Sequence, residues 1–123
     1  MTENRSQQMV DRLRLFQTTS SDIEASAIIS VDGLSIASAL PKDVEEDRVS
    51  AMSAAILSLG RRITSELGRG AVEQVYVKGP SGYVILMSAG DEAVLTALVT
   101  EKAKLGLIFL EMQKVADDLI KMV

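Results

Sequence analysis

Apolar residues recur every three or four positions, which is the spacing of a helix, in three segments of this 123-residue chain. They predict helices over residues 5–18, 44–67 and 105–123. In the intervening segments the period shortens to two or the sequence becomes continuously apolar, which is typical of strands. Five strands are predicted, over residues 23–31, 34–40, 73–78, 83–89 and 93–99.

The order helix, two strands, helix, three strands, helix predicts an α+β fold in a single domain over residues 1–123. The strands at 83–89 and 93–99 are nearly all apolar, so both of their faces must be covered. We expect the long central helix to cover one face of the sheet and the two terminal helices to cover the other. The strand at 73–78 is the least hydrophobic and is expected at an edge, where it can pair with another chain.

Local signals mark the first hairpin and the ends of the long helix. Asp32-Gly33 separates the first two strands and is a strong signal for a two-residue hairpin turn. Asp43 and Glu46 have the spacing of a capping box, and Gly68 suits a left-handed stop. A helix over residues 44–67 would be about 36 Å long. That is long for a domain of this size.

The long helix carries two stripes of different character. The bulky stripe is expected to pack on the sheet and consists of Val49, Met52, Ile56, Leu59, Ile63 and Leu67. The small stripe lies opposite and consists of Ser50, Ala51, Ala54, Ala55 and Ser58. Small side chains let a second helix approach closely, whereas a solvated helix face of this length would normally carry Lys and Glu.

These features predict a homodimer formed by the small stripe and the edge strand. The candidate interface residues are Ala51, Ala54, Ala55 and Ser58 on the helix and Val75, Tyr76 and Val77 along the joined edge. The alternative is that the alanines need no partner, because alanine is simply the best helix former.

Arg61 and Arg62 lie near the C-terminal end of the small stripe, and Ser65 follows one turn later. In an antiparallel helix pair these arginines would lie at both ends of the shared surface. There they could bind an acidic or nucleotide-bound partner. We therefore predict partner binding near Arg61, Arg62 and Ser65. The alternative is that both arginines are solvated and only compensate the helix dipole.

The composition excludes several kinds of chemistry. The chain has no cysteine and no histidine, which removes disulfides, thiolate chemistry, the usual zinc ligand sets and Ser–His–Asp triads. It also lacks the phosphate-binding P-loop motif. We therefore expect a protein that is not an enzyme and that uses no cofactor and no metal.

The charge and the apolar runs bear on partners and location. A net charge of −4, with only two tyrosines and two phenylalanines, provides neither the basic surface nor the stacking platform that nucleic-acid binding needs. No apolar run approaches the length of a membrane span, and the first residues lack an apolar signal core. We expect a cytoplasmic protein with no nucleic-acid partner and no membrane insertion.

Several segments carry a resemblance to a known family. They are Val31-Asp32-Gly33-Leu34, Leu67-Gly68-Arg69-Gly70, Gly82-Tyr83-Val84-Ile85-Leu86, Ala89-Gly90-Asp91 with Ala93-Val94-Leu95, and Leu105-Gly106-Leu107 with Glu111-Met112. Together with the order of elements, they resemble the Roadblock (dynein light-chain) family, especially its MglB-like prokaryotic branch. The resemblance extends from about Met9 to Val123.

The resemblance implies a five-stranded antiparallel sheet and a homodimer built from the long helix and the third strand. It also implies binding to a small Ras-like GTPase and modulation of its nucleotide cycle. In the MglB-like branch, stimulation of hydrolysis is thought to reposition the GTPase's own residues. Arg61 and Arg62 are therefore not interpreted as arginine fingers, and the family supplies no catalytic motif to transfer.

Two other functions stay open from the sequence. The same dimer could be an adaptor that assembles a motor or signalling complex without altering a nucleotide cycle. The chain could instead be a small-molecule sensor with a related helix-covered sheet. The sensor is the less favoured of the two, because nearly every apolar position has a packing role and few polar groups remain for a pocket.

Overall fold

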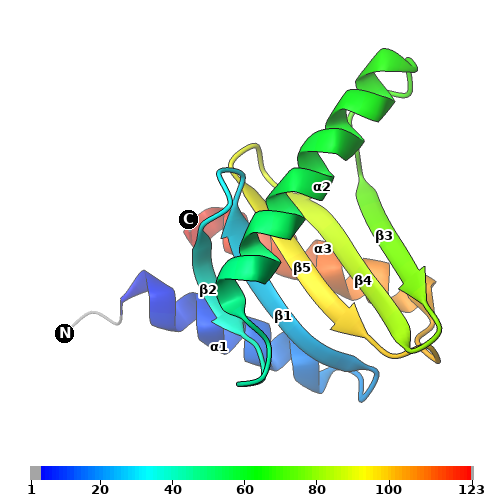
Figure 1. The fold of residues 1–123 in the computed structure, drawn as a ribbon. Coiled ribbons are helices and arrows are strands. Elements are labelled where there is room, and N and C mark those ends of the chain that lie inside the picture. The colour runs from blue at the N-terminus through cyan, green and yellow to red at the C-terminus, as the bar shows by residue number, and fades with distance from the viewer. Residues whose placement is uncertain (1–3, 123) are drawn as a thin grey trace.

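A computed structural model describes residues 4–122 and contains the eight predicted elements in the predicted order (Figure 1). The helices are α1 (Arg5–Thr18), α2 (Glu46–Glu66) and α3 (Leu105–Met122). The strands are β1 (Ile23–Ser30), β2 (Ser35–Ala39), β3 (Gln74–Gly79), β4 (Gly82–Ala89) and β5 (Ala93–Val99). The predicted end of the last helix at Val123 lies outside the described residues. No helix of residues 4–122 has the length and apolar character needed to cross a bilayer.

The five strands form one antiparallel sheet in the order β2-β1-β5-β4-β3. The nearly all-apolar strands β4 and β5 lie inside the sheet, as the continuous apolar pattern predicts. β3 is an edge strand, which confirms the position predicted from its weak hydrophobicity. One side of β3 therefore carries backbone groups that no other strand of residues 4–122 pairs.

Helices cover both faces of the sheet, with α1 and α3 on one face and α2 crossing the other diagonally (Figure 1). The larger core lies between the sheet and the helix pair α1 and α3, where Leu13, Phe16 and Met112 are fully buried. An ion pair of 2.7 Å between Arg12 Nε and Asp118 Oδ2 joins these two helices. The prediction that the terminal helices share one face is confirmed.

The packing under α2 corrects the predicted orientation of this helix. Its buried residues are Ser50, Ser53 and Leu57. The small apolar core on this side consists of buried Leu57, Leu86 and Val94, with partly buried apolar residues such as Val75 packed against it. Ser53 Oγ accepts a hydrogen bond of 3.0 Å from Thr96 Oγ1 of β5. Small side chains under the helix let its backbone lie close to the sheet.

The bulky stripe was therefore wrongly predicted to pack on the sheet. Met52 is 57% exposed, and Leu59, Ile63 and Leu67 are similarly exposed, while Val49 and Ile56 are half-buried. The stripe runs along the flank of α2 nearest β3. The small stripe runs along the other flank, where Ala51 and Ala54 lie close to Gly33 of the first hairpin. Ser50, predicted to lie opposite the sheet, is buried under the helix.

The start of α2 and its capping box were also wrongly predicted. Helix α2 begins at Glu46, its N-cap residue is Glu45, and no side chain caps it, so the capping box from Asp43 does not form. A turn closed by the Val44 N–H donating to the Pro41 carbonyl places Asp43 before the helix. The Glu46 carboxylate instead accepts a hydrogen bond from the Ser35 hydroxyl, which joins the start of α2 to β2.

The first hairpin is confirmed, but its turn is longer than the two residues predicted. Ser30 ends β1, and its N–H donates a hydrogen bond of 2.8 Å to the Leu34 carbonyl oxygen. Gly33 has φ +90°, whereas no residue other than glycine has a positive φ in the described residues. A two-residue type I′ turn requires positive φ at both central positions. Asp32 does not supply it, so the turn widens.

Gly60 allows α2 to lie close to β3, and this contact gives a testable sign. A Cβ at Gly60 would lie 2.9 Å from Val75 Cγ2. In a helix interior without this contact, replacing glycine by alanine would raise the free energy of unfolding by about 1 kcal/mol. Because of the contact, we expect Gly60→Ala to lower the free energy of unfolding. In a Val75→Ala background the same substitution should be stabilising. Urea denaturation of the four variants measures this, and a destabilisation that persists beside Ala at position 75 contradicts the contact.

Candidate functional site

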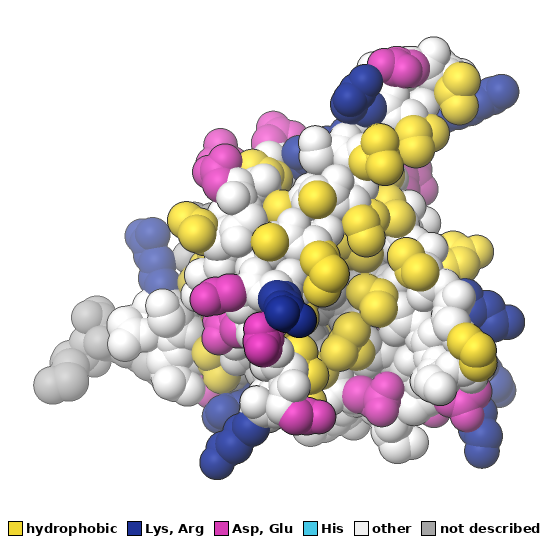
Figure 2. All heavy atoms as spheres, viewed as in Figure 1, with side chains coloured by type: hydrophobic (Ala, Val, Ile, Leu, Met, Phe, Trp, Pro, Cys, Tyr) yellow, Lys and Arg dark blue, Asp and Glu magenta, His cyan; other side chains and the backbone are white. Residues whose placement is uncertain are grey.

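The surface formed by α2 and β3 is unusually apolar. More than half of the strongly exposed large apolar side chains in residues 4–122 lie on α2, directly after it, or on β3; they are Met52, Leu59, Ile63, Leu67, Tyr76 and Val77. Figure 2 shows apolar side chains following one flank of α2 and continuing over the sheet. Contiguous exposed apolar surface of this kind is typical of interaction sites and binding grooves. We call the bulky stripe together with β3 the α2–β3 surface.

An apolar groove of about 230 Å³ forms part of this surface. Val49, Met52 and Ile56 of α2 line one side of it. Val77 and Val84, which are paired neighbours on β3 and β4, line the other. The groove exists because the small residues beneath α2 fill little of the space between the helix and the sheet edge.

The predicted edge residues alternate between the two faces of β3. Val75 pairs with Leu86 and Val77 with Val84, on the α2 side, and Val75 is half-buried against the helix. Tyr76 points to the α3 side, where its ring centroid lies 6.2 Å from that of Tyr83 and 6.0 Å from that of Phe109. Tyr76 and Val77 are exposed at the edge and point to opposite faces of the sheet. A strand added to β3 would therefore place side chains beside both of them.

The predicted helix residues do not form one continuous face. Ala51, Ala55 and Ser58 are exposed, but Ala54 is half-buried beside the first hairpin. At 100° per residue, Leu59 lies opposite buried Ser50 and therefore points away from the sheet. Ala55 adjoins Leu59 one turn earlier. The face turned away from the sheet thus combines part of the small stripe with part of the bulky stripe.

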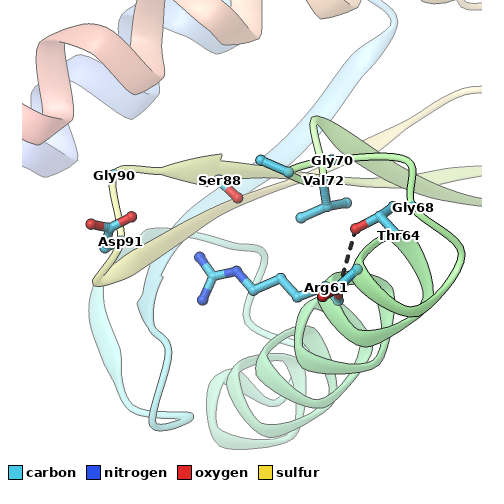
Figure 3. A pocket seen from close by; sticks show the side chains of 10 residues that line it. Arg61, Thr64, Gly68, Gly70, Val72, Ser88, Gly90 and Asp91 are labelled. Carbon is cyan, nitrogen blue, oxygen red and sulfur yellow. Dashed lines mark hydrogen bonds between the residues drawn. The ribbon is translucent and has the colours of Figure 1, made fainter.

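A second feature is a pocket of about 650 Å³ between the C-terminal half of α2, the segment that follows it and the β4–β5 turn (Figure 3). We call it the Arg61 pocket. The Arg61 side chain is half-buried and extends from α2 across the pocket toward Ser88 and Asp91. Thr64 donates a hydrogen bond of 3.2 Å to the Arg61 carbonyl, which ties it to the same wall.

The pocket brings together two of the three predicted partner-binding residues. Arg61 and Ser65 both line it, whereas Arg62 is exposed and forms a 3.6 Å ion pair with Glu66 on the outer surface. The two arginines diverge because neighbouring helix residues are 100° apart. Arg61 therefore belongs to a pocket and Arg62 to the open surface.

Sequence reasoning missed the functional potential of several residues. Met52, Leu59 and Ile63 were assigned to the core, although exposed apolar residues on an amphipathic helix can equally face a partner. Ser88 was predicted only as part of a strand, and Asp91 was named only in a segment that carries the family resemblance. The available signal was Gly90-Asp91, since a turn places a carboxylate at the surface beside the next element. In residues 4–122 no group of three or more Asp and Glu side chains is placed to hold a metal ion.

The chain is an α+β protein with one antiparallel sheet between a single helix and a helix pair. A model of the Roadblock/LC7 domain matches residues 9–99, which is most of the chain. The chain therefore belongs to the Roadblock/LC7 family, as its resemblance predicts.

Relatives and solved structures agree with this assignment. The uncharacterized protein MJ0310 of Methanocaldococcus jannaschii is 37% identical over 109 residues, covering 89% of this chain and 95% of that protein. The structure of Myxococcus xanthus MglB has a TM-score of 0.87 at 16% identity, covering 99% and 92% of the two chains. A Roadblock/LC7 domain from Streptomyces avermitilis has a TM-score of 0.84 at 22% identity, covering 89% and 92%. These structures share the fold of this chain.

Proposed function

We propose that this protein is a homodimeric, non-enzymatic regulator that binds a small Ras-like GTPase and modulates its nucleotide cycle. The observation that carries the proposal is the exposed bulky stripe beside a sheet edge that no strand of residues 4–122 pairs, in a chain of the Roadblock/LC7 family. A monomer with this surface would expose apolar area that association removes from water. The MglB-like resemblance supplies the class of partner.

The proposed dimer joins the α2–β3 surfaces of two copies. A two-fold axis beside β3 would let the two β3 edges pair and would bring the two α2 helices together, so that each copy contributes the same residues. Met52, Leu59 and Ile63 supply exposed apolar side chains to this interface. Ala55 adjoins Leu59 and permits a close helix approach, whereas Ala51 and Ser58 lie toward the other flank of α2, farther from the joined edges. Val75, Tyr76 and Val77 lie along the joined edge.

The GTPase is proposed to bind across the paired α2 helices. Arg62 and Ser65 are exposed toward the C-terminal end of α2, and Arg61 lies beside them with its side chain in the pocket. An exposed arginine can pair with a carboxylate or phosphate of the partner. The ion pair of Arg62 with Glu66 is exposed and therefore contributes little to the stability of the fold. Arg62 can thus exchange Glu66 for a partner group at small cost.

The proposal is tested with the Ras-like GTPase encoded nearest to this chain. Single-turnover GTP hydrolysis and nucleotide exchange are measured with and without the protein, and binding is measured by calorimetry. We expect binding together with a changed rate of one of these steps. Binding with both rates unchanged would contradict regulation and favour the adaptor. No binding to the GTPase in either nucleotide state would contradict the proposed partner class.

Arg62→Glu tests where the partner binds. We expect it to lower affinity for the GTPase about tenfold or more, because a rim charge of the wrong sign opposes association. The matched control is Arg14→Glu, which reverses an exposed arginine on α1, on the opposite face of the sheet. Equal affinity losses in both variants would indicate a general charge effect and would place the partner elsewhere.

A further inference from the structure

The Arg61 pocket holds a positive and a negative side chain that do not pair with each other. In the described residues, neither Arg61 nor Asp91 forms an ion pair within 4.0 Å. Arg61 lines the pocket from α2 and Asp91 lines it from the β4–β5 turn. The Arg61 guanidinium extends toward this turn (Figure 3). A half-buried guanidinium directed into a cavity offers several donors in a fixed plane, a geometry that fits a carboxylate.

We propose that the Arg61 pocket binds a small zwitterion, with its carboxylate at Arg61 and its ammonium group at Asp91. This inference goes beyond the GTPase partnership and does not depend on it. A purely anionic ligand such as phosphate would meet the Asp91 carboxylate on the far wall, and a purely cationic one would meet Arg61. Only a ligand with both charges satisfies both walls.

The remaining lining of the pocket suits such a ligand. Thr64, Ser65 and Ser88 place three hydroxyl groups around it, and each can donate or accept a hydrogen bond. Ala71 and Val72 provide an apolar patch for a short carbon chain. The volume of about 650 Å³ falls within the usual size of small-molecule sites. The sequence-based argument against a sensor, that few polar groups remain for a pocket, therefore does not hold at this place in the fold.

The pocket also adjoins the surface proposed for partner binding. Arg61 and Ser65 line it, and Arg62 lies next to Arg61 on the outer surface of the same turn of α2. A ligand that fixes Arg61 would act directly on this part of the helix. Binding itself can be measured on the protein alone, so its outcome is separate from that of the GTPase assay.

Thermal shift and calorimetry with defined probes test the proposal. Glycine, γ-aminobutyrate and 6-aminohexanoate form a zwitterion series in which the separation of the charges increases. Hexanoate, hexylamine and inorganic phosphate carry one kind of charge only. We expect one member of the zwitterion series to raise the melting temperature in proportion to the logarithm of its concentration. At the same concentration the single-charge probes should have a much smaller effect.

Three variants assign the binding to the pocket. Arg61→Gln should lower the affinity for the zwitterion about tenfold or more, since it removes a charge-assisted contact. Asp91→Asn should lower it as well while leaving any weak binding of hexanoate unchanged or stronger. Arg48→Gln is the matched control, because Arg48 is an exposed arginine of the same helix outside the pocket, and it should leave the affinity unchanged.

Several results would overturn the inference. If no zwitterion shifts the melting temperature, the two charges serve only the protein itself, and equal destabilisation by Arg61→Gln and Asp91→Asn would then point to an internal ion pair. If phosphate or hexanoate binds as well as the zwitterions, the site recognises only an anion. If binding survives Arg61→Gln, the ligand lies elsewhere.

Discussion

Replacing Leu59 by glutamate is expected to convert the proposed dimer into a monomer. Leu59 is 56% exposed and belongs to the bulky stripe, through which the two helices of the proposed dimer would meet. The substitution removes an apolar contact and places a carboxylate in its position. Because it occurs twice in a symmetric dimer, a loss of about 2 kcal/mol per copy raises the dissociation constant about a thousandfold. Light scattering behind a sizing column measures the mass.

The control for this experiment is Leu110→Glu. Leu110 is also 56% exposed and also lies on a helix, but that helix, α3, covers the other face of the sheet. It should leave the mass at that of the unsubstituted protein. Three results contradict the proposed interface: a monomeric unsubstituted protein, a Leu59→Glu variant that remains a dimer, and equal dissociation in both variants. Circular dichroism confirms that each variant is folded.

The fold could be predicted from the sequence because its signals are local and redundant. The periodicity of Met9, Leu13 and Phe16 and the apolar runs of β4 and β5 each reflect burial directly. Layering followed from these runs, since a strand that is apolar on both sides needs cover on both faces. The edge position of β3 followed from its weak hydrophobicity, since a strand with few apolar residues does not need cover on both faces.

The orientation of α2 could not be predicted in this way. A helix with one bulky and one small stripe can place either stripe, or the line between them, on the sheet. The burial of Ser50, Ser53 and Leu57 selects the line between them, and it leaves the two stripes along the flanks of α2. The deciding contacts, such as Gly60 against Val75 and Ser53 with Thr96, join residues far apart in sequence. Periodicity contains no information about them.

The candidate site was predicted only in part for a related reason. Arg61 and Ser65 were identified from their place on a helix, but the opposing wall of the pocket comes from Ser88 and Asp91, over twenty residues later. Whether these two residues come close to Arg61 depends on how α2 crosses the sheet, which is a tertiary property.

Gly82→Ala is expected to cause the largest loss of folding stability among the substitutions considered. Gly82 begins β4 directly after the turn from β3 and has φ +145°, a conformation that residues with a side chain rarely adopt. A Cβ at this position would lie 2.4 Å from the Val99 carbonyl oxygen, which belongs to the backbone of β5. The neighbouring pair of Tyr83 with Val99 fixes β4 and β5 together at this point, so the chain cannot move aside without breaking the ladder.

We expect Gly82→Ala to lower the free energy of unfolding by about 3 kcal/mol or more, since strain and collision add. The same turn offers a matched control in Gly79→Ala. Gly79 pairs with Gly82, but its nearest neighbour would lie 3.9 Å from a new Cβ, so its effect should stay within about 1 kcal/mol. Urea denaturation at one protomer concentration measures both, because the stability of a dimer depends on concentration. Similar denaturation midpoints for the two variants would contradict the close approach of Gly82 to the Val99 carbonyl.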